Sequence, residues 1–455
     1  MSDFSMAMNI RISLPEDVKY IIRTINEAGY EAYAVGGCVR DKLLNKEPND
    51  YDITTSAKPL DIKKLFRRTI DTGIEHGTVT VMLKDKGYEI TTYRIDGAYE
   101  DNRHPSTVSF TDDLTEDLLR RDFTINAMAY NDEKGLVDPF NGCQDLSDHV
   151  IRCVGIAYER FSEDALRIMR AVRFSAQLGY RIDDETYDAM CKLSPNLKDV
   201  SMERIQVELV KLVTSSNPQN IRIAYKTGIT KVFFDEFNRM METSQNHPHH
   251  MYSVGEHSIK AMENIEDDKY LRLAMLFHDI GKPLVKVTDE EGIDHFHGHA
   301  GVSKQIATAV LKRLKFDNNT IKIVSKLSYY HDLNINTDQK SVRRAINEVG
   351  EDIFPLLLKV KKADILAQSE YKREEKLSKL NKLNEIYNSI IANGDCLNLK
   401  DLAINGSDLI DIGYPMGSAL GKELNRLLQN VLEDPSLNEK DQLLKMSMED
   451  LGEIK

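Results

Sequence analysis

Two aspartates one residue apart follow a pair of glycines near the start of the chain. Gly36 and Gly37 lie in VGGCVRD, and Asp50 and Asp52 lie in NDYDI. If NDYDI is a strand, both carboxylates point to one face, where they repel unless a cation lies between them. Mg²⁺ prefers such oxygen ligands. The glycines would let phosphates approach backbone N–H groups, and Arg40 would add positive charge. The alternative is a glycine turn beside two solvated acids.

A second polar group follows in LLRRDFTINAMAY. It contains Arg121, Asp122 and Asn126 ahead of an apolar stretch. A nucleotide site needs cations that hold a triphosphate and an acceptor for a ribose hydroxyl, and these residues supply both kinds of group. In isolation the same residues fit a capped helix start with exposed arginines equally well.

The segment ERFSEDALRIMRAVRF predicts one helix with a polar face. Arg160, Asp164, Arg167 and Arg170 recur at helical spacing along it and would therefore share that face. An ion-paired stripe facing solvent is the common explanation of such a pattern. A neighbouring Asp and Arg can also hydrogen-bond the edge of a nucleobase.

Histidine is concentrated between His247 and His331. Six His and Asp side chains of this part of the chain are possible metal ligands: His257, His278, Asp279, His299, His331 and Asp364. Imidazole and carboxylate ligands brought together by helices suit a transition metal such as Zn, Ni, Mn or Fe. The His278-Asp279 pair, followed by Ile-Gly-Lys-Pro, makes this pattern more specific than isolated histidines.

The elements that must position these residues divide the 455-residue chain into several domains. Residues 15–29 predict a helix, and EAYAVGG, YDITTSA, VTVML and YEITTYR predict strands; helical patterns prevail afterwards. We predict an α+β protein with a small α/β domain at the start of the chain, followed by helical domains. The expected boundaries are 1–137, 138–215, 216–375 and 376–455.

Composition limits the function classes. No apolar run approaches the roughly 18 to 20 residues that cross a bilayer, and the N-terminus lacks a signal-peptide pattern, so we expect a cytoplasmic protein without membrane contact. The five cysteines lack paired spacing and are expected to be reduced. A net charge of -13 does not favour nucleic-acid binding. If RNA binds, we expect basic residues to gather on one surface, among them Arg152, Arg160, Arg170 and Arg173.

In order and spacing, GGCVRD with DYD, RRDFTINAMA, DPFNG and RFSEDALRIMRAVRFSAQLG resemble the motifs of bacterial class II tRNA nucleotidyltransferases, the CCA-adding enzymes, and of their poly(A) polymerase relatives. The similarity spans roughly residues 15–215 and implies a palm-like nucleotidyltransferase head followed by helical neck, body and tail domains. It implies template-independent addition of CCA to the 3′ end of tRNA from CTP and ATP, with release of pyrophosphate and with Mg²⁺ as cofactor.

By this resemblance each motif residue receives an expected role. Asp50 and Asp52 would be catalytic and bind Mg²⁺, and Asp122 would lie near the ribose 2′-hydroxyl. Asp164 and Arg167 would select C or A, with Glu163 in support. The nucleotide would be contacted by Gly36, Gly37, Arg40, Arg121, Asp122, Asn126, Asp164, Arg167 and Arg170.

The histidine pattern resembles HD-superfamily metal-dependent phosphohydrolases. The resemblance assigns His257, His278, Asp279 and Asp364 to a four-ligand site, with His299 and His331 as ligands of a second metal. It implies hydrolysis of phosphate esters such as 2′,3′-cyclic phosphates.

Three alternatives remain. The first is an enzyme that adds A alone, but the polar segment Tyr93–Leu114 resembles the flexible loop of full CCA-adding members and favours CCA addition. A poly(A) polymerase is the second alternative. An HD phosphohydrolase with a non-catalytic, RNA-binding head is the third.

Overall fold

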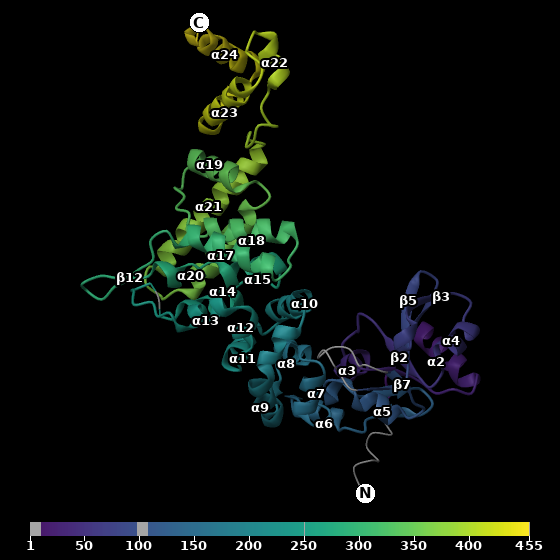
Figure 1. Ribbon diagram of the computed structural model, residues 1–455. Helices are drawn as coiled ribbons and strands as arrows, with labels where there is room; N and C mark the ends of the chain where they lie inside the picture. Colours follow the sequence, from purple (N-terminus) through teal and green to yellow (C-terminus); the bar gives the residue numbers. More distant parts are fainter. Residues whose placement is uncertain (1–10, 98–107, 250, 455) are drawn as a thin grey trace. The chain divides into compact units, whose positions relative to one another are not determined.

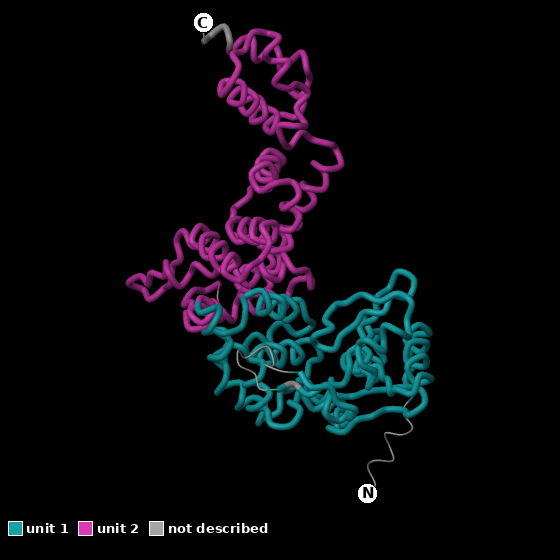
Figure 2. Tube along the Cα trace, turned by 45° about the vertical axis from the view of Figure 1, so that its right-hand side comes forward, with its two compact units in different colours: residues 1–235 teal, residues 236–455 magenta. Residues whose placement is uncertain are grey.

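The computed structural model describes residues 11–97, 108–249 and 251–454. Contacts divide the chain into two compact units, Met1–Asp235 and Glu236–Lys455 (Figure 2). The first unit contains the head sheet and a set of helices, and the second is built almost entirely of helices. The predicted α+β class is confirmed.

A mixed seven-stranded sheet forms the head, with strand order β3-β4-β5-β2-β1-β8-β9. Strand β1 pairs antiparallel with β2 and β8, whereas β2 and β5 run parallel. The strands are β1 (Ala32–Val35), β2 (Asp52–Thr55), β3 (Thr69–Gly73), β4 (Thr78–Leu83), β5 (Lys86–Thr92), β8 (Ala129–Asn131) and β9 (Gly135–Val137). The four strands predicted from β-rich segments are confirmed.

Helix α2 (Glu16–Glu27) begins after Pro15, carries acidic residues in its first turn and buries Val18, Ile21, Ile22 and Ile25. This apolar stripe has helical periodicity, and burial of each such side chain contributes about 1.5–3 kcal/mol. The other helices of the head are α3 (Gly37–Leu43), α4 (Pro59–Leu65) and α5 (Leu114–Leu119).

Helices make up most of the remainder of the first unit. They are α6 (Gly142–Ser147), α7 (Ala157–Glu163), α8 (Leu166–Leu178), α9 (Asp184–Leu193), α10 (Met202–Val213), α11 (Ile221–Lys226) and α12 (Ile229–Phe233). A short parallel pair, β10 (Val150–Ile151) and β11 (Arg181–Ile182), accompanies them.

The predicted single helix over ERFSEDALRIMRAVRF is wrong, because the chain is interrupted between α7 and α8. Asp164 has an extended conformation with φ -136° and ψ 102°. Its Oδ1 accepts a hydrogen bond from the backbone N–H of Leu166 at 3.0 Å. An Asp side chain that binds the backbone in this way competes with the helical pattern and starts a new helix. The expected common face of Arg160, Asp164 and Arg167 therefore does not form.

In the second unit, α14 (Val254–Glu263), α15 (Lys269–Phe277), α17 (His299–Arg313), α18 (Asn318–Tyr330) and α20 (Phe354–Ala367) pack together (Figure 1). The other helices are α16 (Lys282–Val285), α19 (Gln339–Val349), α21 (Arg373–Asn393), α22 (Gly406–Asp411), α23 (Ser418–Glu433) and α24 (Lys440–Ile454), and α13 (Asp235–Glu242) crosses the boundary. The predicted all-helical body also contains a hairpin of β12 (Val287–Thr288) and β13 (Asp294–His295). Thr288 Oγ1 and Lys286 bind Asp294, which holds this hairpin.

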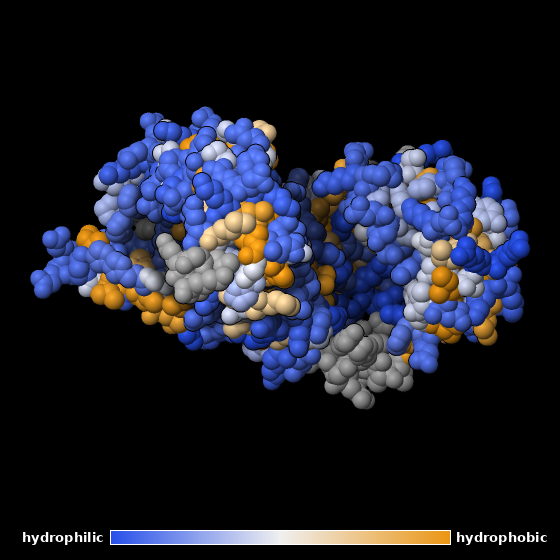
Figure 3. Space-filling view, turned by 90° about the horizontal axis from the view of Figure 1, so that it is seen from above, coloured by the Kyte–Doolittle hydropathy of each residue, from blue (hydrophilic) through white to orange (hydrophobic). Residues whose placement is uncertain are grey.

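The face drawn in Figure 3 is mainly hydrophilic, with hydrophobic residues in small separate groups. Among the described residues, no helix has both the length and the apolar character that a membrane crossing requires. No disulfide joins the five cysteines, all of which lie among the described residues.

Candidate functional site

The glycine turn lies directly beside Asp52. Val35, the last residue of β1, pairs with Asp52 in β2. Gly36 follows with a positive φ of 82° and donates its N–H to the Met128 carbonyl at 3.0 Å. A Cβ atom at Gly36 would lie only 2.9 Å from Nη1 of Arg121. The positive φ therefore favours glycine here, and the missing side chain lets the guanidinium group of Arg121 approach the turn closely.

The two carboxylates point away from the head core. Tyr51 is buried, whereas Asp50 and Asp52 are exposed, as alternation along an extended segment predicts. The neighbouring residues partly shield the carboxyl group of Asp52 from water, which raises its pKa. The positive charge of Arg121 opposes this shift, whereas the negative charges of Asp50 and Glu89 add to it. Excess negative charge at this position fits a cation-binding site.

Glu89 was not predicted as a site residue. It lies on β5, whose parallel pairing with β2 aligns Ile90 with Ile53 and brings Glu89 near Asp52. The sequence shows only a glutamate in a β-rich segment. Its proximity depends on the strand order, which the sequence pattern does not specify.

A chain of hydrogen bonds joins four of the predicted nucleotide-binding residues. Arg40 Nη1 donates to Oδ1 of Asn126 at 2.7 Å, and Asn126 Nδ2 donates to Oδ1 of Asp122 at 3.1 Å. Arg170 donates from Nε to Oδ2 of Asp122 at 2.7 Å. Burial alone would raise the pKa of Asp122, but Arg170 and Asn126 lower it to about 2. The residues thus form one preorganised polar strip.

Asp164 and Arg167 are held separately. Arg204 Nη2 donates to Oδ2 of Asp164 at 2.8 Å, while Arg167 Nη1 donates to Oε2 of Glu163 at 2.7 Å. Arg167 Nη2 also binds the carbonyl of Arg120 at 2.7 Å. Arg204, in α10, was not predicted; its only sequence signal is an amphipathic helix downstream of the motifs.

The four arginines expected on an RNA-facing surface all pair with carboxylates. Their partners are Asp145 and Asp183 for Arg152, Glu163 for Arg160, Asp122 for Arg170 and Glu208 for Arg173. The expectation is wrong for Arg173, whose side chain is only 8% exposed. Arg173 on α8 pairs with the buried Glu208 on α10 and therefore does not face solvent. Burial lowers the pKa of Arg173 to about 10 against the effect of Glu208.

The segment Tyr93–Leu114 contains two short strands at its ends. Strand β6 (Arg94–Asp96) pairs antiparallel with β7 (Val108–Phe110). Residues 98–107, the middle of the predicted flexible loop, lie outside the described residues.

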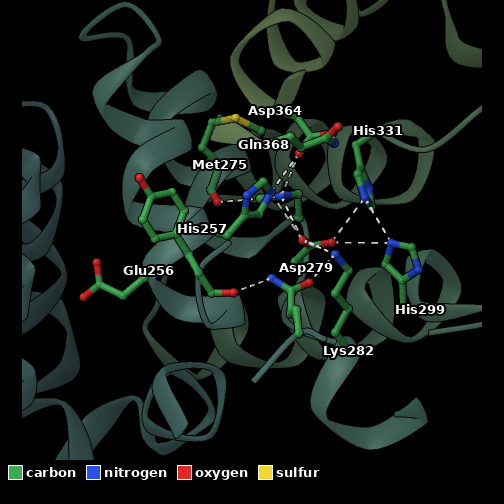
Figure 4. A network of polar contacts seen from close by, with 12 residues as sticks. Glu256, His257, Met275, Asp279, Lys282, His299, His331, Asp364 and Gln368 are labelled. Carbon is green, nitrogen blue, oxygen red and sulfur yellow. Dashed lines mark hydrogen bonds and ion pairs between the residues drawn. The ribbon is translucent and has the colours of Figure 1, made fainter. Parts of the chain in front are cut away.

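The predicted metal ligands of the second unit lie together in space (Figure 4). His257 comes from α14, His278 and Asp279 follow α15, and the remaining three come from α17, the end of α18 and α20: His299, His331 and Asp364. The ligand atoms of His257, His278 and Asp279 lie within 4.8 Å of one another, and so do those of Asp279, His299 and His331. Asp279 is therefore common to two possible metal sites.

Hydrogen bonds to the backbone fix the ring orientation of three of these histidines. Each Nδ1 contacts a backbone carbonyl: His278 that of Met275 at 2.8 Å, His299 that of Phe296 at 2.9 Å and His331 that of Ser328 at 2.8 Å. A neutral ring whose Nδ1 carries the proton presents a bare Nε2, which is the usual arrangement of metal-binding histidines. The Nε2 atoms of His299 and His331 are only 3.2 Å apart. Two lone pairs at this distance require a proton or a cation between them.

Asp279 completes the evidence that a metal fits. The residue is 1% exposed, yet neither carboxylate oxygen accepts a hydrogen bond, and Nε2 of His278 also has no hydrogen-bond partner. Nζ of Lys282 lies 2.7 Å from Oδ2 of Asp279, and Nε2 of His278 lies 3.2 Å from the same oxygen. Burial alone would raise the pKa of Asp279, but His278 and Lys282 hold it well below its ordinary value. A buried anion surrounded by imidazole nitrogens suits one or two cations.

Gly281 sets the distance between the two halves of this cluster. A Cβ atom at this position would lie 2.6 Å from both the His299 carbonyl oxygen and the Ser303 backbone nitrogen. The Gly281 N–H donates to Oγ of Ser303 at 2.9 Å. The chain after Asp279 therefore packs directly on the first turn of α17.

Family models match three parts of the chain. Residues 32–152 match "Poly A polymerase head domain", and residues 179–241 match "Probable RNA and SrmB- binding site of polymerase A". Residues 287–447 match the model of tRNA nucleotidyltransferase domain 2. The first match contains both the glycine turn and the aspartate pair.

Full-length comparisons agree with these models. The CCA-adding enzyme of Pediococcus pentosaceus is 34% identical over 430 residues, which cover 94% of this chain and 96% of that protein. The solved Bacillus stearothermophilus CCA-adding enzyme in complex with CTP has 28% identity and a TM-score of 0.70, with 95% of this chain and 96% of that chain covered. The Thermotoga maritima CCA-adding enzyme complexed with tRNA shares the fold, with 22% identity, a TM-score of 0.57 and 98% of each chain covered.

The similarity to relatives over nearly the whole length, together with the head motifs, shows that the chain belongs to the family of CCA-adding enzymes, which are nucleotidyltransferases.

Proposed function

We propose that the head site adds CCA to the 3′ end of tRNA, using CTP and ATP and releasing pyrophosphate. The observation that carries the proposal is the contact of the Gly36 turn with Arg121 beside Asp52. It joins a phosphate-accessible backbone, a cation and a carboxylate pair where β1 ends and β2 begins. The related enzymes whose structures contain CTP or tRNA support these partners.

In the proposed reaction, Asp50 and Asp52 hold Mg²⁺. Bound Mg²⁺ would favour deprotonation of an attacking 3′-hydroxyl and neutralise the charge of the leaving pyrophosphate. Arg121 and the turn at Gly36 and Gly37 hold the triphosphate through the guanidinium and backbone N–H groups. Asp122, fixed by Asn126 and Arg170, accepts a hydrogen bond from the ribose 2′-hydroxyl. Positioning and electrostatic stabilisation then supply most of the rate enhancement.

Asp164 and Arg167 are proposed to select the base. A carboxylate accepts a hydrogen bond from the amino group of C or A, and a guanidinium donates to ring or carbonyl acceptors. Arg204 holds one oxygen of Asp164, and the Leu166 N–H holds the other. Arg204 is thus proposed as a positioning residue for base selection.

Replacing Arg204 by Gln should weaken discrimination more than overall turnover. Without the 2.8 Å contact to Arg204, the Asp164 side chain can rotate. Its hydrogen bond then stabilises the binding of a correct base less. We expect about a tenfold loss in the ratio of CTP to UTP incorporation, as for one good base-edge hydrogen bond. Single-nucleotide incorporation with each nucleotide measures the ratio. A uniform decrease for all four nucleotides would indicate a structural role only.

An incorporation assay tests the proposed activity and separates it from the alternatives. Three tRNA transcripts end at the discriminator base, after CC and after CCA, and each is incubated with Mg²⁺ and labelled CTP or ATP. Addition of C, C and A to the shortest transcript, followed by arrest, supports the proposal. Addition of a single A to the CC-ended transcript alone identifies an A-adding enzyme, and long A tracts identify a poly(A) polymerase.

A second candidate activity is metal-dependent hydrolysis of phosphate esters in the second unit. It is favoured by the buried carboxylate of Asp279, which lies within 3.6 Å of the Nε2 atoms of four histidines. The proposed ligands are His257, His278, Asp279, His299, His331 and Asp364. A transition metal held there would supply an activated water, and Lys282 would orient a phosphate beside Asp279.

Metal analysis tests this candidate independently of activity. We expect the purified protein to bind Zn, Ni, Mn or Fe at one to two ions per chain, with binding lost when Asp279 is replaced by Asn. The matched control is Asp294→Asn, because Asp294 is a buried aspartate of the same unit that holds the β12–β13 hairpin and belongs to no proposed ligand set. Equal metal content in the parent and in Asp279→Asn would eliminate the proposed centre.

A further inference from the structure

The ring of Phe174 lies among three arginines of the first unit. The guanidinium carbons of Arg173, Arg40 and Arg170 lie over it, at 3.8, 5.1 and 5.3 Å from the ring centroid. All three distances are within the roughly 6 Å over which the negative face of an aromatic ring attracts a cation. Phe174 therefore contacts a group of positive charges and not a single side chain.

Two of these arginines are the ends of the polar strip in the candidate nucleotide site. Arg40 begins the strip through its hydrogen bond to Asn126, and Arg170 ends it at Asp122. Arg40 comes from α3 and Arg170 from α8, so the two ends are far apart in the sequence. One ring thus contacts both ends of a hydrogen-bonded chain of four residues.

The hydrogen bonds of both arginines lie at the edge of the guanidinium group. Arg40 donates to Asn126 and, from Nε and Nη2, to Oδ1 of Asp41. Arg170 donates to Asp122. The N–H groups of a guanidinium ion point outward in its plane, so these bonds do not occupy its flat faces. Aromatic rings pack on such faces. The ring therefore supplies a contact that the hydrogen bonds cannot.

The ring itself is held in place. Phe174 is 5% exposed, and Phe123 packs edge-on against it with ring centroids 5.7 Å apart and an interplanar angle of 80°. Phe123 directly follows Asp122 and donates its N–H to Oδ1 of that residue at 2.8 Å. The same dipeptide thus binds Arg170 through its carboxylate and Phe174 through its phenyl ring.

An aliphatic side chain would fill this space but would not replace the ring. The three guanidinium groups repel one another, and each is paired with one carboxylate, that of Asp41, Asp122 or Glu208. A leucine has no negative face to offset the remaining repulsion. It would therefore let Arg40 and Arg170 move apart, and Asp122 would lose part of its fixed position.

We propose that Phe174 is a positioning residue for nucleotide selection. Its ring holds Arg40 and Arg170, and through Arg170 it fixes the carboxylate of Asp122 for the ribose 2′-hydroxyl. The inference rests on the proposed function of the head site and adds a residue that does not itself touch the nucleotide. It predicts that the choice between a ribonucleotide and a deoxyribonucleotide depends on an aromatic side chain at this position.

Incorporation of CTP and of dCTP into a tRNA lacking CCA tests the inference. The test variants are Phe174→Leu and Phe174→Met, whereas Phe174→Tyr retains the aromatic ring. The control is Phe66→Leu, because Phe66 is buried in the same unit, packs edge-on against Tyr20 at 6.5 Å and belongs to no proposed site. The ratio of kcat/KM for the two nucleotides is independent of the fraction of active protein, so partial unfolding of a variant does not change it.

We expect Phe174→Leu and Phe174→Met to lower the ratio of CTP to dCTP at least about fivefold, the factor that corresponds to one cation–π contact, and to raise the KM for CTP. Phe174→Tyr and Phe66→Leu should keep the parental ratio. If one aliphatic variant does not fold, the other decides. An unchanged ratio in the aliphatic variants, or an equal loss in Phe66→Leu, would overturn the inference, whatever the change in stability.

Equilibrium binding separates failure of this inference from failure of the proposed function. A parent protein that binds CTP but incorporates neither C nor A would reject the proposed function, and the ratio of the dissociation constants for CTP and dCTP in parent and variants would then decide the inference. A parent that adds CCA, with a ratio insensitive to the aliphatic replacements of Phe174, would keep the function and reject the inference.

Discussion

Replacement of Asp52 by Asn should reduce C and A incorporation by at least about a thousandfold. The carboxamide keeps the size of the side chain but removes a negative charge from the proposed Mg²⁺ site, and metal-ion catalysis supplies several kcal/mol at about 1.4 kcal/mol per tenfold rate. Single-turnover incorporation of labelled C into a tRNA lacking CCA measures the loss. Because Asp52 is exposed, the variant should fold as the parent does.

Asp85→Asn is the matched control, since Asp85 is an exposed acid between β4 and β5 and belongs to no proposed site. Its incorporation rate should equal that of the parent. An Asp52→Asn variant that retains activity within tenfold of the parent would show that the head does not use this carboxylate. It would also revive the alternative of a non-catalytic, RNA-binding head.

Replacement of Glu208 by Gln should destabilise the first unit by about 3–5 kcal/mol, the usual cost of breaking a buried ion pair. Arg173 Nε lies 2.8 Å from Oε2 of Glu208, and the two side chains are 8% and 5% exposed. The variant leaves the guanidinium buried without its counter-charge. Urea unfolding, followed by the transition of the first unit, measures the change.

Glu203→Gln is the control on the same helix, because Glu203 is exposed; it should shift stability by at most about 1 kcal/mol through the helix dipole. A double replacement, Arg173→Met with Glu208→Met, should recover most of the loss, because an apolar pair needs no counter-charge. Equal effects of Glu208→Gln and Glu203→Gln would show that the buried pair contributes little.

The regular elements of the head were predictable because their patterns are local. The stripe of Val18, Ile21 and Ile25 predicts α2, and the four β-rich segments predict strands β1, β2, β4 and β5. The break at Asp164 was not predictable from periodicity. It depends on one side chain that binds Leu166 locally and Arg204 from another helix.

The candidate sites were predictable to different extents. The residue types of the six-ligand cluster were visible as a histidine-rich segment, and the structure brings all six together. Glu89 and Arg204 were missed, because their proximity to Asp52 and Asp164 arises from strand order and helix packing.

The contact at Gly281 bears on how the cluster would acquire metal. Because backbone atoms of α17 lie where a methyl group at Gly281 would be, packing holds Asp279 close to His299. In the proposed metal centre, the ligands would then lie together before an ion binds, and uptake would require no large displacement. Affinity would reflect the desolvation of the ions and their bonds, and divalent ions would compete for the two sites that share Asp279.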